Sequence, residues 1–355
     1  MDWHFQKGSI MRMRSILGSC CFSILLIVST SAVGQENADE LFKKGHMLAG
    51  EGSYEEAIRL FTQVIAIRPK TPEAFLNRGF SYAKLGQHEE AVKDYGQAIS
   101  LKPKYLEAYM NRASSFLFQG DFKRALEDYT IAIEIDPKRA EGYFNRGIAY
   151  VRTGDYKKAL EDYDEAIELN SSYAEAYGNR GFVHQILGDH EKAVRDFSEA
   201  IGLDQENANA YYNRGISGAS MGHVEDALRD FGKAISLDPM NSNAYRSRGI
   251  TLSEMKEPQR AMEDLNKAIQ LNPGDVRAYL ARGNLWEAMG NHLEAVKDFD
   301  EAIHVDPQNA DAYNNRAIAY RNSGNKAGAI RDWQKAAQLG SEEARKHLRS
   351  QGRGW

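Results

Sequence analysis

Cysteine is almost missing from this sequence. Cys20 and Cys21 are the only two among 355 residues, and both lie within the first 34 positions. The rest of the chain holds no thiol, which excludes disulfides and thiolate metal sites there. A chain of this kind suits an oxidising compartment, where a stray thiol is a liability.

A surplus of basic residues is also missing. The 45 Lys and Arg are outnumbered by 50 Asp and Glu, which gives a net charge of −5 and a pI near 6.0. Charges of both signs are interspersed along the same segments, whereas phosphate binding requires a basic stripe. We therefore expect no nucleic-acid partner.

The sequence lacks the short motifs of common enzymes. It has no GxxxxGK phosphate loop, no HExxH zinc motif and no GxSxG nucleophile elbow. We expect a protein without catalytic residues, cofactor or metal site. An enzyme is the least favoured alternative, and an activity abolished by a single substitution would revive it.

Repetition is what the sequence has most of. Nine units of 34 residues run without insertion or deletion from Ala38 to Glu343. Each unit has Gly or Ala at its eighth place and Ala at its twentieth, from Ala57 to Ala329. The predicted units span residues 38–71, 72–105, 106–139, 140–173, 174–207, 208–241, 242–275, 276–309 and 310–343.

The spacing within a unit predicts a helix, a tight turn and a second helix. Small residues at the eighth place would face the alanine of the second helix and let the two backbones approach. An aromatic residue or Leu at the twenty-fourth place follows the helical period and would fill the core. Gly at the fifteenth place, where only Lys256 differs, ends the first helix in the left-handed conformation. Pro at the thirty-second place of six units stops the second helix.

This pattern resembles the tetratricopeptide repeat, whose signature combines a 34-residue period with Gly, Tyr, Ala, Phe and Pro at fixed offsets. The resemblance implies an all-α fold, a right-handed superhelical solenoid of nine helix-turn-helix repeats. Residues 341–355 follow as a C-terminal capping helix, beginning at Ser341, and a tail. One departure stands out, because Arg occupies the seventh place of eight units where the family commonly has Leu.

Each of these arginines has an Asp sixteen residues later. The first unit has Lys44 and Leu60 at the same two places, so both residues change together. We therefore predict structural ion pairs across each hairpin, with two independently solvated charges as the alternative. The pairs are Arg78 with Asp94, Arg112 with Asp128, Arg146 with Asp162, Arg180 with Asp196, Arg214 with Asp230, and three more from Arg248 to Asp332.

The resemblance also implies that the first helix of each repeat lines a concave groove. The sixth place is Asn in six units, in an arrangement similar to the asparagine ladder of O-linked N-acetylglucosamine transferases; Ser247 and Ala281 interrupt it. An amide carries both donor and acceptor, so such a row can bind a peptide backbone. The alternative is that these amides only solvate a helix face. The predicted residues are Asn77, Asn111, Asn145, Asn179, Asn213 and Asn315.

Apolar residues at the fifth and ninth places would line the same groove. They would accept the side chains of an extended or helical segment. The alternative is that they form the core between repeats. The predicted groove residues are Phe80, Phe144, Ile148, Phe182, Tyr212 and Ile216.

The first 34 residues resemble an export signal. Lys7, Arg12 and Arg14 precede an uncharged stretch that ends at Gln35. Its apolar centre is short for a span of about 20 residues. We expect cleavage near Gly34, with Ala32 as the second choice and a retained membrane anchor as the alternative. Met11 and Met13 are alternative starts, and Leu17 to Cys20 loosely resembles a lipoprotein box.

Taken together, these features predict an exported, non-catalytic scaffold that binds peptide segments or partner proteins in its groove. Export would place it in the periplasm, the cell envelope or outside the cell. The alternative is a structural module that self-associates, or joins an envelope complex, through its convex face or its ends. The sequence identifies neither the partner nor the oligomeric state.

Overall fold

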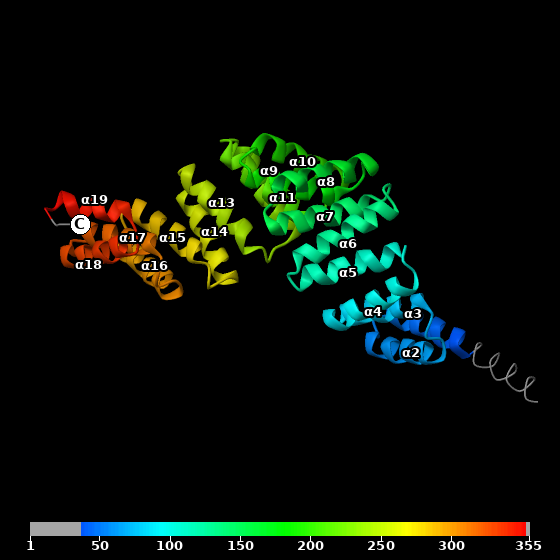
Figure 1. The fold of residues 1–355 in the computed structure, drawn as a ribbon. Coiled ribbons are helices and arrows are strands. Elements are labelled where there is room, and N and C mark those ends of the chain that lie inside the picture. Colours follow the sequence, from blue (N-terminus) through cyan, green and yellow to red (C-terminus); the bar gives the residue numbers. More distant parts are fainter. Residues whose placement is uncertain (1–36, 353–355) are drawn as a thin grey trace, which may run out of the picture. The chain divides into compact units, whose positions relative to one another are not determined.

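A computed structural model describes residues 37–352 of the chain. Within this range the chain forms helices joined by short turns, without a strand, and the fold is an all-α helical repeat solenoid (Figure 1). The expected fold class is therefore confirmed. The leader predicted for residues 1–34 lies outside the described residues. No helix in the described range combines the length and apolar character that a membrane crossing needs.

The chain divides into two compact units, and the first ends at Ser171. Its described part begins with helical residues 37–50. Each later helix contacts the one before it. The helices are α2 (Tyr54–Ile67), α3 (Pro72–Lys84), α4 (His88–Leu101), α5 (Leu106–Phe118), α6 (Phe122–Ile135), α7 (Ala140–Thr153) and α8 (Tyr156–Leu169).

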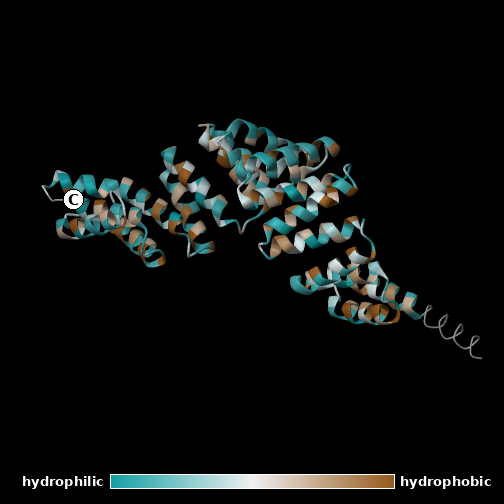
Figure 2. Ribbon diagram, in the orientation of Figure 1, coloured by the Kyte–Doolittle hydropathy of each residue, from teal (hydrophilic) through white to brown (hydrophobic). Residues whose placement is uncertain are grey.

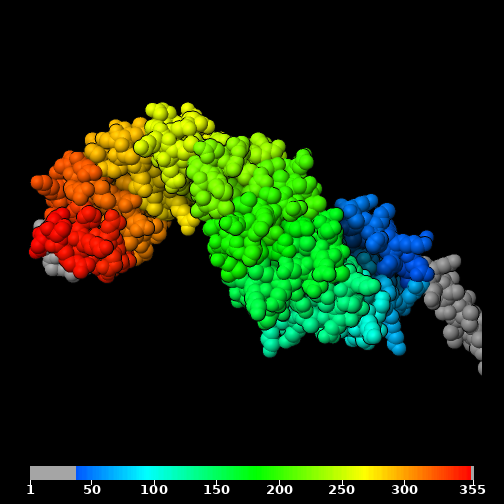
Figure 3. Space-filling view, turned by 90° about the horizontal axis from the view of Figure 1, so that it is seen from above, coloured from blue at the N-terminus to red at the C-terminus, as the bar shows by residue number. Residues whose placement is uncertain are grey.

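The second unit begins at Ser172, and its colours follow one another in chain order from green to red (Figure 3). Its last helix caps the array: Ser341 accepts a hydrogen bond from the Ala344 amide at 3.2 Å, and Leu348 is fully buried against the preceding helix. The helices are α9 (Ala174–Ile186), α10 (His190–Leu203), α11 (Ala208–Ser220), α12 (Val224–Leu237), α13 (Ser242–Glu254), α14 (Pro258–Leu271), α15 (Val276–Ala288), α16 (His292–Val305), α17 (Ala310–Asn322), α18 (Lys326–Gln338) and α19 (Glu342–Ser350).

The core of each hairpin consists of the twentieth-place alanine and the twenty-fourth-place ring or Leu, which are buried in every repeat. Apolar residues recur along the helices between polar ones (Figure 2). The small eighth-place residue lies close to the twentieth-place alanine of the second helix, as expected. A Cβ on Gly79 would lie 2.8 Å from a ring carbon of Tyr95, and 3.2 Å from the carbonyl oxygen of Ala91. Glycine therefore makes room both for the backbone of the second helix and for the ring, which the sequence reasoning had not placed against it.

The turn between the two helices has the expected left-handed residue. Every fifteenth-place glycine has a positive φ, from 75° at Gly86 to 89° at Gly324. Lys256 adopts the same conformation with φ of 62°, and it is the one non-glycine residue among the described residues that does so. The turn geometry is thus conserved across the array even where the sequence departs from glycine.

Lys256→Gly should stabilise the protein by about 1 kcal/mol, because an L side chain is strained in this conformation. Gly154→Ala, at the equivalent turn of α7, should destabilise it by a similar amount. Hydrogen exchange of the amides in the two flanking helices, for each variant beside the parent, checks both signs. Equal shifts in the same direction would contradict the turn assignment.

Candidate functional site

The arginine at the seventh place pairs with aspartate in all eight repeats that carry it. Arg146 in α7 donates from Nε and Nη2 to the two carboxylate oxygens of Asp162 in α8, at 2.9 and 2.8 Å. The aspartate side chains are 5 to 11% exposed, and the arginine side chains are 17 to 26% exposed. The other bidentate pairs are Arg78–Asp94, Arg112–Asp128, Arg180–Asp196, Arg214–Asp230, Arg248–Asp264, Arg282–Asp298 and Arg316–Asp332.

Each arginine makes further contacts that sequence reasoning missed. The guanidinium carbon lies 5.4 to 5.9 Å from the centre of the aromatic ring three residues earlier, as with Arg146 and Tyr143. In several repeats Nη1 also donates to the preceding repeat, as from Arg146 to Thr130 Oγ1 at 3.2 Å. One guanidinium therefore links the two helices of its hairpin and, in these repeats, also links the hairpin to the preceding repeat. The recurring Tyr at the fourth place was the signal that could have revealed the ring contact.

Burial and ion pairing shift the pKa of Asp162 in opposite directions. Burial raises the pKa of Asp162, and the hydrogen bonds from Arg146 offset only part of that rise. The hydrogen bond with Asp162 raises the pKa of Arg146 above its ordinary value. Arg146 is thus held as a cation by its structural partner.

The sixth-place asparagines lie on the first helices of their repeats, and these helices contact one another in series within each unit. All six side chains are half-buried. Two of them already have partners: Asn77 Nδ2 donates to the Glu73 carbonyl at 2.7 Å, and Asn315 Nδ2 donates to Asn284 Oδ1 at 3.1 Å.

The other four asparagines differ. Within residues 37–352, the structure gives the side-chain amides of Asn111, Asn145, Asn179 and Asn213 no hydrogen-bond partner. A half-buried amide without a protein partner retains its full capacity to bind a ligand. Of the six predicted asparagines, two therefore have partners and four have none among the described residues.

The apolar groove candidates are neither sealed nor fully open. Phe80 and Phe182 are 37% and 42% exposed, while Phe144, Ile148, Tyr212 and Ile216 are half-buried. Tyr212 and Phe144 pack at a tilt against the core rings Phe231 and Tyr163. Each of these side chains thus divides its surface between the core and solvent.

Two exposed residues on the first helices were not among the candidates. Phe118 at the end of α5 is 78% exposed and stacks on His88, with ring centres 4.8 Å apart. Ile186 at the end of α9 is 43% exposed. Both occupy the thirteenth place of their repeats, at the end of the first helix.

A hollow of about 410 Å³ lies where the asparagine row is interrupted, on α13 and α15. Ala281 takes the place of the amide, and Ile250, Leu280 and Asn284 line the hollow with it. Glu254 and Arg277 add charge to the lining. The exposed lining of this recess is thus more apolar than polar, with a few charged groups beside it.

Three histidines share the seventeenth place of their repeats, at the start of the second helix. His88, His190 and His292 are all half-buried. The Nδ1 atoms of His88 and His190 are buried without a partner. Across the described range, the structure brings no three potential ligands among His, Cys, Asp and Glu together as a metal site.

Family models match almost the whole array. A tetratricopeptide repeat model matches residues 72–105, 140–173 and 174–207, and a second, described as TPR repeat, matches residues 45–86 and 114–154. Another tetratricopeptide repeat model matches residues 219–276 and 280–345. The chain belongs to the tetratricopeptide repeat family. The fold of this family is that of a protein–protein interaction scaffold.

Solved tetratricopeptide repeat structures share the fold. A protein from Parabacteroides merdae is 23% identical, with a TM-score of 0.54, and the match covers 70% of this chain and 98% of that one. PilF from Pseudomonas aeruginosa is 21% identical, with a TM-score of 0.53, covering 59% and 97%. The anaphase-promoting complex assembly Cut9–Hcn1 gives 12% identity and a TM-score of 0.56, covering 88% and 76%. No curated protein matches the sequence.

Proposed function

We propose that this tetratricopeptide repeat protein is a non-catalytic scaffold that binds extended peptide segments along the first helices of its repeats. The observation that carries the proposal is the set of four half-buried asparagine amides that have no hydrogen-bond partner within residues 37–352. An extended peptide exposes one N–H and one C=O for each residue, and an asparagine amide can bond to both kinds of group. The peptide backbone would supply the missing partners.

The apolar residues beside the amides would hold the side chains of the peptide. Phe182 lies on α9, and Tyr212 and Ile216 on α11, within one unit. Phe80, Phe144 and Ile148 play the same part in the other unit. Since their exposed area is modest, they favour one or two anchoring side chains per repeat.

Asn111→Ala with Asn145→Ala should weaken peptide binding about tenfold, because each lost hydrogen bond contributes roughly 0.5–1.5 kcal/mol. The ligand is a peptide selected from a random display library against the purified chain, and calorimetry gives its affinity. Circular dichroism should show unchanged helical content. The same design applies to Asn179 and Asn213.

Asn77→Ala is the matched control, because this amide is already bonded within its own helix. It should change affinity less than about threefold. Equal losses in the control and the double variant, or no loss in either, would refute the proposed groove.

A further inference from the structure

Gly218 is an exception at the eleventh place of the repeats. It lies in α11, in the sixth repeat, and every other repeat has a large side chain at the equivalent position. These residues are Leu48, Tyr82, Phe116, Tyr150, His184, Leu252, Trp286 and Tyr320. All of them are buried or half-buried in the structure.

The third repeat shows what an eleventh-place side chain fills. Phe116 is 5% exposed and packs in one cluster with Ala125 of the second helix. Val92, from the preceding repeat, packs against the same cluster. The ring therefore occupies a space between two consecutive repeats.

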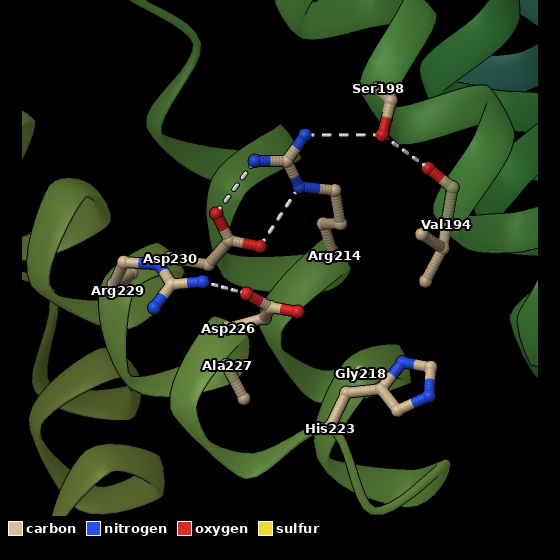
Figure 4. A pocket seen from close by; sticks show the side chains of 9 residues that line it. All are labelled: Val194, Ser198, Arg214, Gly218, His223, Asp226, Ala227, Arg229 and Asp230. Carbon is tan, nitrogen blue, oxygen red and sulfur yellow. Dashed lines mark hydrogen bonds and ion pairs between the residues drawn. The ribbon is translucent and has the colours of Figure 1, made fainter.

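The sixth repeat has the same surroundings without the ring. Val194 and Ala227, the counterparts of Val92 and Ala125, line a cleft of about 270 Å³ together with Gly218 (Figure 4). Gly218 is buried, and a Cβ there would meet the His223 carbonyl oxygen at 3.8 Å and Ala227 Cβ at 3.9 Å, both ordinary contact distances, so a side chain can be added at this position. An apolar cavity of about 150 Å³ is enough to hold benzene. One aromatic ring therefore fits.

Arg214 gives this cleft a cationic wall. It donates to Asp230 from Nε and Nη2, and to Ser198 Oγ from Nη1 at 3.1 Å. Arg146 makes the same set of bonds in the fourth repeat, and there the ring of Tyr150 lies 6.0 Å from the guanidinium carbon. One face of the Arg214 guanidinium therefore borders the open cleft. In the fourth repeat, the same face of Arg146 lies near the ring of Tyr150.

The remaining lining is polar. His223 and Asp226 are exposed, and Figure 4 shows them with Ala227 on the α12 side of the cleft. Asp226 stands where Arg124 and Lys158 lie over the eleventh-place rings of the third and fourth repeats. Asp226 is paired through Oδ1 with Arg229, which also lines the cleft. The guanidinium and the second carboxylate oxygen can both hydrogen-bond a hydroxyl group, which favours a ring with a hydroxyl over a purely apolar one.

We propose that this cleft is a socket for one aromatic side chain of a protein partner, with tyrosine as the best fit. The partner's ring would take the position that the chain's own ring takes in the third and fourth repeats. None of the candidate groove residues lines the socket, so the inference is independent of the proposed peptide groove.

The test uses N-acetyl-L-tyrosinamide as the probe, because it presents the side chain between two peptide bonds. Nuclear magnetic resonance of the labelled full chain should show saturable shifts of the Gly218 and Ala227 amides, with a dissociation constant of about 1–10 mM. N-acetyl-L-leucinamide should bind at least about threefold more weakly, because it cannot stack on Arg214. Binding of p-cresol without binding of the tyrosinamide would overturn the assignment to a protein side chain.

Gly218→Phe should fill the socket from within. We expect it to weaken tyrosinamide binding at least about tenfold and to raise the melting temperature, as a helical glycine is replaced and a cleft is filled. Gly218→Ala is the matched control, with binding reduced less than about threefold. Undiminished binding by the Phe variant would overturn the proposal, and so would failure of that variant to fold, since the socket must accept a phenyl ring.

Discussion

Arg146→Ala is expected to destabilise the α7–α8 hairpin by about 3 kcal/mol or more at neutral pH, because it leaves the Asp162 carboxylate buried without its cation. The Asp162 side chain is 6% exposed and accepts two hydrogen bonds from Arg146. Hydrogen exchange of the hairpin amides measures the loss locally. A local measurement is needed because repeat arrays do not unfold in one step.

The loss of stability in Arg146→Ala should be smaller at acidic pH than at neutral pH. Burial raises the pKa of Asp162 above 3.8, and removing Arg146 removes the main opposing influence. A carboxyl group with a raised pKa in the folded state takes up its proton more readily there than in the unfolded chain. Its contribution to stability is therefore most favourable below about pH 3.8 and is lost as the pH rises through the folded pKa. The deficit of Arg146→Ala should shrink as the pH falls toward 4.

A double-mutant cycle with Asp162→Ala separates the pair from other effects. We expect a coupling of at least about 1 kcal/mol, since removing both partners leaves no buried charge. Arg152→Ala, on the same helix but exposed, should change stability by less than about 0.5 kcal/mol. A coupling near zero would mean that the two charges are solvated independently.

The sequence predicts those features that depend on spacing alone. The left-handed turns follow from glycine at the fifteenth place of eight repeats, whereas the left-handed conformation of Lys256, the one departure there, is visible only in the structure. The register of Arg and Asp could be inferred because Lys44 and Leu60 change together. Both inferences need only the length of the unit and the identity of its residues.

Features that depend on a particular neighbour are not predictable in this way. Asn77 and Asn111 have the same type and place, but His46 Nδ1 lies 3.4 Å from Asn77 Oδ1, and Asn111 has no such partner among the described residues. The division of the array at Ser171 likewise has no clear mark in the composition. Glycine at the eleventh place of the sixth repeat is visible in the sequence. The cleft could not be predicted from it, because only the structure shows what space the eleventh-place ring fills in other repeats.

Gly147→Val is expected to destabilise the α7–α8 hairpin by about 2–3 kcal/mol through overpacking. A Cβ at this position would lie 2.6 Å from one ring carbon of Tyr163 and 3.0 Å from another. Tyr163 is 1% exposed, so the ring has little room to move. In an exposed helix, replacing Gly would instead stabilise by up to about 1 kcal/mol, so the sign of the effect separates the two explanations.

Gly96→Ala is the control, for which we expect a change of the opposite sign. This glycine lies in α4, and an added Cβ would meet only Arg112 Nη1, at 3.7 Å, so we expect a gain of up to about 1 kcal/mol. Hydrogen exchange of each hairpin measures both changes. If Gly147→Val also proved neutral or stabilising, the close approach to Tyr163 would not limit the hairpin. Helical propensity would then account for both glycines, and the eighth-place residue would have no special role in bringing the two helices together.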